Sequence, residues 1–182
     1  SAKLVVGHLV LNGAIKANGS NAGNYHYHGS AGGSVWIVAN VLEGAGSISA
    51  DGSNGGRNGH GGGGGRVAVY YQENRGFDLG KLSAKGGHQA DSENRYGGAG
   101  TVYIANLLEE KSTLILKGES KNSPQYELTD ISGDVDVLIE GASVHVTGDV
   151  YVHDGWHLND AKVTVDGVLG VLGGSLSLVD SE

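Results

Sequence analysis

The chain has 182 residues, about the length of one domain, and 34 of them are glycine without a collagen-like three-residue period. The formal net charge of −8, with no basic cluster, argues against nucleic acid as a partner, and no apolar run is long enough to insert into a membrane. The absence of cysteine excludes disulfides, thiolate zinc sites and cysteine nucleophiles. The chain shows no signal-peptide pattern and does not begin with methionine, so we expect a piece of a larger protein with further domains.

Two repeated elements organise the first hundred residues. The pattern G-x-[IL]-x-A-x-G begins at Gly13, Gly46 and Gly80, at spacings of 33 and 34 residues. A second, apolar element recurs in step with it at residues 34–39, 66–71 and 101–106. Both elements alternate with a period of two, which is typical of β-strands.

Stacking the copies gives equivalent residues equivalent surroundings. Ile15, Ile48 and Leu82 would then form one buried ladder, and Val35 with its equivalents would form another. A single copy cannot bury its apolar face, and its neighbours complete the core. The sequence therefore predicts an all-β fold, a parallel β-helix (β-solenoid), taken as right-handed because parallel connections generally are.

Between the two strands of each copy lies a glycine-rich excursion, which we call an arm. The three arms span residues 20–33, 53–65 and 87–100 and have nearly equal lengths. Glycine lets backbones approach closely, so we expect the arms to stack and pair through backbone hydrogen bonds rather than to hang as loops.

The composition changes after the third copy. We expect glycine-rich solenoid turns over residues 1–107, a charged connection with one strand over residues 108–130, and short turns continuing the same rod over residues 131–182. The last region repeats at about 19 residues, because Val144-x-Val146-x-Gly148 matches Val163-x-Val165-x-Gly167.

The candidate ligand-binding side chains are aromatic rings, imidazoles and guanidinium groups near the arm ends, together with two outward aromatic side chains on the wall. They are Tyr25, His26, Tyr27, His28, Arg57, His60, Arg95 and Tyr96 in the arms, and Trp36 and Tyr103 on the strands. Aromatic rings stack on sugars, and Arg or His side chains donate to hydroxyl or carboxylate groups. Two other readings remain: the arm residues fill space over glycine backbones, and the wall residues cover the sheet beneath a loop.

Cofactor sites find little support in the sequence, and we expect none. His26, His28 and His60 could hold a transition metal, but no carboxylate accompanies them. The segment 51–54 offers oxygen ligands for calcium, but too few.

An enzyme is the alternative to a binding module. Asp134 and Asp149 follow equivalent glycines and could form a column on the outer wall, with Asp136, Asp154 and Asp166 near them. A glycosidase needs two carboxyl groups about 5–9.5 Å apart, one with a raised pKa, and a solvated wall does not readily supply this.

The segments GGSVWIVANVLEGAGSISADG and GGRNGHGGGGGRVAVYY resemble the glycine-rich β-helix repeats of large secreted or surface-attached proteins, mostly bacterial. The last third is similar in a general way to filamentous haemagglutinin-type β-helices, and the run 61–65 to the polyglycine tips of phage tail-fibre adhesins. The resemblance implies an extracellular or cell-surface module acting in adhesion, with a polysaccharide or cell-surface glycan as partner. It assigns no catalytic residue, and the alternatives are a polysaccharide lyase or glycoside hydrolase, or a purely structural stalk.

Overall fold

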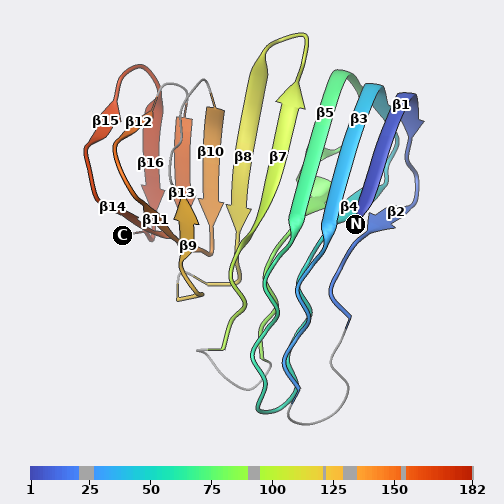
Figure 1. Ribbon diagram of the computed structural model, residues 1–182. Coiled ribbons are helices and arrows are strands. Elements are labelled where there is room, and N and C mark those ends of the chain that lie inside the picture. The colour runs from blue at the N-terminus through green and yellow to red at the C-terminus, as the bar shows by residue number, and fades with distance from the viewer. Residues whose placement is uncertain (21–26, 90–94, 121, 129–134, 153–154, 182) are drawn as a thin grey trace.

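The protein is described by a computed structural model that covers residues 1–20, 27–89, 95–120, 122–128, 135–152 and 155–181. The fold is all-β and is dominated by one large mixed sheet (Figure 1). The strands of this sheet, in spatial order, are β1 (Ala2–Val10), β3 (Ser34–Glu43), β5 (Arg66–Arg75), β7 (Gly100–Asn106), β8 (Lys111–Lys117), β10 (Val135–Glu140), β13 (Gly155–Asn159) and β16 (Ser175–Val179).

Three small parallel sheets accompany the large one. They are formed by β2 (Ala14–Lys16), β4 (Ser47–Ser49) and β6 (Leu82–Ser83); by β9 (Tyr126–Leu128), β11 (Ser143–Val146) and β14 (Lys162–Val165); and by β12 (Val150–Val152) and β15 (Leu169–Val171). None of these four sheets closes on itself within the described ranges. The described helical structure is one 3₁₀ turn at Leu79–Lys81, and no described helix is long and apolar enough to cross a membrane.

Equivalent residues of successive repeats pair in register, which confirms the predicted ladders. Ile48 is the parallel partner of both Ile15 and Leu82. On the large sheet, Val67 pairs in the same way with Val35 and with its equivalent on β7. Ile48 and Val67 are buried because strands of the neighbouring copies cover them on both sides.

The pair β7–β8 is antiparallel, whereas every other pair of neighbouring strands in the large sheet is parallel. The sequence did not predict this reversal. Only residues 107–110 join the two strands, and Glu110 adopts a left-handed backbone conformation with φ 54°. A parallel connection needs a dozen or more residues, so a link this short produces a hairpin.

The reversal has a consequence for the core. On β8, Ile115 packs against a first core formed by side chains of β3–β7, whereas Leu114 and Leu116 belong to a second core formed by β10–β16. Successive side chains of a strand point to opposite faces of its sheet. The two halves of the molecule therefore bury opposite faces of one continuous sheet.

The arms extend together beyond the amino ends of β3, β5 and β7 (Figure 1). Their described residues exchange backbone hydrogen bonds in several directions. Gly29 donates to His60 at 2.8 Å, Gly62 to Ser53 at 2.9 Å, and Gly87 to Gly62 at 2.8 Å. Except for a single bridge between Gly55 and Gln89, these residues form no β-ladder, so the arms are a hydrogen-bonded bundle.

The bundle depends on glycine because its backbones nearly touch. A Cβ added at Gly62 would lie 2.1 Å from the carbonyl oxygen of Ser30, and one at Gly97 would lie 2.0 Å from that of Gly62. No larger residue fits these positions unless the backbone moves.

Candidate functional site

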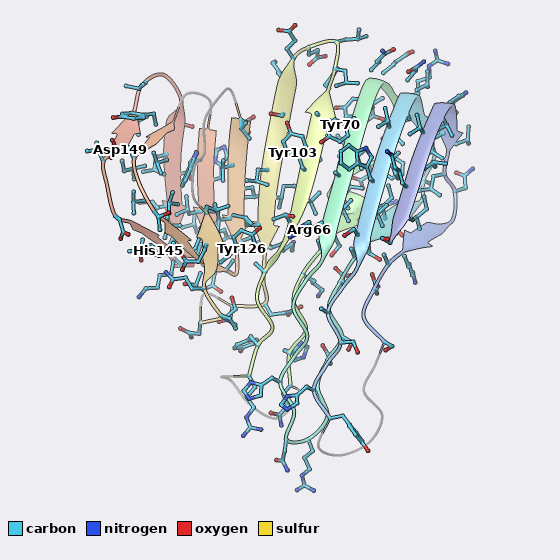
Figure 2. All side chains as sticks on the ribbon, in the orientation of Figure 1. Arg66, Tyr70, Tyr103, Tyr126, His145 and Asp149 are labelled. Atoms are coloured by element: carbon cyan, nitrogen blue, oxygen red, sulfur yellow. The ribbon has the colours of Figure 1, made fainter. Side chains whose placement is uncertain are left out.

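Three aromatic side chains lie in a row on the outer face of β3, β5 and β7, and we call this row the aromatic strip. It consists of Trp36, Tyr70 and Tyr103, and Figure 2 labels the two tyrosines. The rings of Trp36 and Tyr70 stack with centroids 5.4 Å apart and planes 26° apart. The Tyr70 and Tyr103 rings are 5.7 Å apart and tilted by 55°.

The strip follows from the strand alternation. Val35 and Val67 point into the first core, so Trp36 and Ala68, which follow them, point outward. Ala68 pairs directly with both Trp36 and Tyr103, and its small side chain leaves a gap between their rings. Tyr70, two residues farther along β5 on the same face, bridges this gap.

Part of the strip remains open to a ligand. A centroid distance of 5.4 Å means that the two rings are offset, not superimposed, and Trp36 is 46% exposed. The ammonium group of Lys3 lies 5.6 Å from the indole centroid, within cation–π range. Burial, and then the neighbouring Tyr103, raise the pKa of Tyr70, so its hydroxyl remains a hydrogen-bond donor in neutral solution.

A groove of about 250 Å³ lies beside the strip, at the roots of the arms. Its polar side chains are Ser34, Arg66 and Thr101, which are direct partners across β3, β5 and β7. Ser34 and Thr101 precede the strip residue of their strand by two positions and Arg66 precedes Tyr70 by four, so all three lie on the face of the strip. Tyr126 of β9 also lines the groove, and the remaining lining is glycine and alanine backbone (Figure 2).

The glycines that line the groove belong to arm roots whose backbones lie very close together. A Cβ at Gly64 would lie 2.0 Å from the carbonyl oxygen of Ala84, and one at Gly65 would lie 2.0 Å from that of Gly33. The arm roots therefore pack backbone against backbone, and glycine is required there.

The arm residues predicted to bind a ligand contact neighbouring arms instead. His28 stacks on His60 with centroids 5.4 Å apart, and its Nδ1 accepts the backbone N–H of His60 at 3.1 Å. Arg95 donates to the carbonyl oxygen of Asn58 at 2.8 Å, and the carbonyl oxygen of Arg57 accepts the side-chain amide of Gln89. These contacts hold neighbouring arms together.

The other arm candidates add little to a shared site. Tyr27 is 64% exposed and Tyr96 is half-buried, whereas Tyr25 and His26 lie outside the described residues. The strip and the arm residues thus form two separate groups on the molecule.

The groove was missed at the level of sequence, although part of its signal was present. Ser34, Arg66 and Thr101 each stand immediately before the repeated valine of their strand, so the repeat already aligned them. Tyr126 had no such signal, because it comes from the non-repeating region after β8.

The candidate acidic and metal-binding residues mostly bond within the fold. His145, which is labelled in Figure 2, lies between Glu127 at 2.9 Å and Asp166 at 2.8 Å, and these carboxylates raise its pKa. Asp149 accepts the backbone N–H of Val168 at 2.8 Å. Asp51, in the segment considered for calcium, accepts from the hydroxyl group of Ser83 on β6 and from the backbone N–H of Lys85, two residues farther along.

No group of three or more His, Cys, Asp or Glu side chains suited to a metal ion occurs in the part of the chain that the structure describes. Asp134 and Asp154 of the expected acidic column lie outside that part. Asp136 lies on β10 and lines a different cavity, on the first-core face of the sheet.

Comparison with known proteins gave no matching family, no similar curated protein and no similar solved structure.

Proposed function

We propose that this chain is a non-catalytic carbohydrate-binding module of a larger secreted or surface protein, and that it acts in adhesion to a polysaccharide or cell-surface glycan. The observation that carries the proposal is the partly open aromatic strip, which lies beside a groove with a guanidinium group and two hydroxyl groups.

The chemistry of the two surfaces suits a sugar chain. The C–H faces of sugar rings pack on aromatic rings, and sugar hydroxyls need directional hydrogen-bond partners. The strip offers the first kind of contact, and Ser34, Arg66 and Thr101 offer the second. Since the strip crosses three neighbouring strands, it suits an extended ligand better than a single small molecule.

The scaffold supports the same proposal. We interpret the parallel ladders of each half as turns of a β-solenoid, in keeping with the resemblance to glycine-rich β-helix repeats of surface proteins. Strand partners that lie one sequence repeat apart, such as Ile15 and Ile48, support this interpretation. A stacked scaffold holds side chains of successive turns at a fixed spacing, as recognition of a repeating polymer requires.

Electrophoresis through gels that contain plant, algal or bacterial polysaccharides would test the proposal. We expect at least one polysaccharide to retard the chain, and Trp36→Ala to abolish that retardation because it removes the most exposed ring of the strip. Tyr151→Ala is the matched control, since Tyr151 is 44% exposed but lies on β12, in the other half.

Incubation of the chain with the same polysaccharides, together with the gels, would also distinguish the alternative functions. Release of reducing ends or unsaturated products would mean that the chain is an enzyme. Unchanged migration in every gel would identify a structural stalk. Equal loss of retardation in the Trp36→Ala and Tyr151→Ala variants would place the binding site elsewhere.

A further inference from the structure

The groove beside the strip differs from the rest of the surface in its charge. Arg66 is its only charged lining residue among those described, and no acidic side chain lines it. The chain as a whole has 20 acidic and 12 basic residues, so a cationic groove without a carboxylate runs against its composition.

Arg66 is also exposed and has no ion-pair partner among the described residues. The other arginine on the same strand, Arg75, instead engages Glu73 through two hydrogen bonds of 2.9 Å each. The guanidinium group of Arg66 is therefore available for a ligand. Its planar, forked donors match a carboxylate in a two-point hydrogen bond.

From this geometry we propose that the groove is a subsite for the carboxylate of an acidic sugar, and that the ligand is a uronate-containing polysaccharide. This inference rests on the proposed function. Arg66 precedes Ala68 by two residues on the same face, a separation of about 6–7 Å along the strand. A sugar ring packed on the exposed part of Trp36, the direct partner of Ala68, directs a ring carboxylate toward Arg66.

The neighbouring groups complete the subsite. The hydroxyl groups of Ser34 and Thr101 flank Arg66 in the same row and suit the sugar hydroxyls next to the carboxylate. Tyr126 lines the groove from the other half of the molecule.

The negative net charge of the chain does not prevent this contact. At about 0.15 M salt the Debye length is about 8 Å, so charges elsewhere on the surface are screened at the groove. The local charge of the groove then decides whether an acidic polymer binds.

Polygalacturonate and its methyl ester provide a direct test, because they share a backbone and differ in charge. Affinity electrophoresis at about 0.15 M salt would compare the wild type, Arg66→Gln and Arg75→Gln. The two variants lose one positive charge each from the same strand, so Arg75→Gln controls for net charge. A thermal melt of each variant would establish that it is folded.

We expect the wild type to be retarded by polygalacturonate at least tenfold more strongly than by the ester. Arg66→Gln should lose that preference, and Arg75→Gln should keep it. Equal retardation by both polymers, unchanged in Arg66→Gln, would overturn the acidic subsite and leave carbohydrate binding intact. No retardation by any polysaccharide of the wider panel would overturn the proposed function and this inference together.

Discussion

The two halves of the molecule use one sheet in opposite ways. The first half, through β7, buries the face that carries Val67 and leaves the face of the aromatic strip open. The second half, from β8, covers that other face with its own core, around Leu116 and Trp156. The face that we propose binds a glycan in the first half is thus the face that is buried in the core of the second half. The comparison shows how Tyr126, from the second half, comes to line the groove of the first.

Strand β8 offers the sharpest test of this comparison, because adjacent residues serve different cores. Leu116 is fully buried in the second core, and Ile115 packs against the first. We expect Leu116→Ala to lower the free energy of unfolding by about 2–5 kcal/mol, as for other large-to-small core changes. Ile115→Ala should cost less, because Ile115 is only partly buried.

Hydrogen exchange would show where each change acts. Leu116→Ala should accelerate exchange mainly in β10 and β13, and Ile115→Ala mainly in β5 and β7. Identical exchange patterns in the two variants would contradict the assignment of opposite faces.

The first half carries the arms, and the described part of the second half has none. Substitutions at two adjacent arm glycines would test whether close backbone packing holds the arms together. A Cβ at Gly62 would collide with the backbone of Ser30, whereas one at Gly63 would find its nearest neighbour 4.0 Å away. We expect Gly62→Ala to destabilise the protein by about 1–3 kcal/mol, in the range of overpacked sites. Gly63→Ala should be neutral or slightly stabilising, because it restricts only the unfolded chain.

Denaturant midpoints of the two variants would measure this difference. If Gly62→Ala and Gly63→Ala had the same midpoint as the wild type, the arms would not be packed as a bundle, and the glycine content would need another explanation.

The repeat made the first half largely predictable. Its spacing aligned Ile15 with Ile48, and its alternation placed Trp36 and Tyr103 on the outer face. The β7–β8 reversal could not be predicted in this way, because it depends on a short turn in a region without a repeat, and Tyr126 of the groove depends on that reversal.

The histidines of the arms show a second limit of sequence reasoning. Their residue type suggested a ligand edge, yet His28 accepts a backbone N–H of the next arm and stacks on His60. An imidazole can bind a ligand or bond to the backbone, and only the path of the neighbouring chain decides between these roles. Tyr25 and His26 remain predictions.

The smallest expected effect concerns pH and again contrasts the two halves. In the second half, hydrogen bonding to Asp166, together with the charges of Asp166 and Glu127, raises the pKa of His145. Because this pKa is higher in the folded than in the unfolded protein, the stabilisation is complete below the unfolded value of about 6.5. It is lost as the pH rises through the raised value.

Denaturation of the wild type and His145→Gln across this range would measure that loss. We expect the wild type to be the more stable protein at acidic pH, and the difference to shrink toward alkaline pH. In the first half, His8 has a single described carboxylate partner, Glu43 at 3.0 Å, in place of the two that flank His145. A difference between wild type and His145→Gln that stays constant with pH would mean that the paired carboxylates do not act through the charge of His145. The cross-strand contact would then stabilise the second half by packing and neutral hydrogen bonds alone.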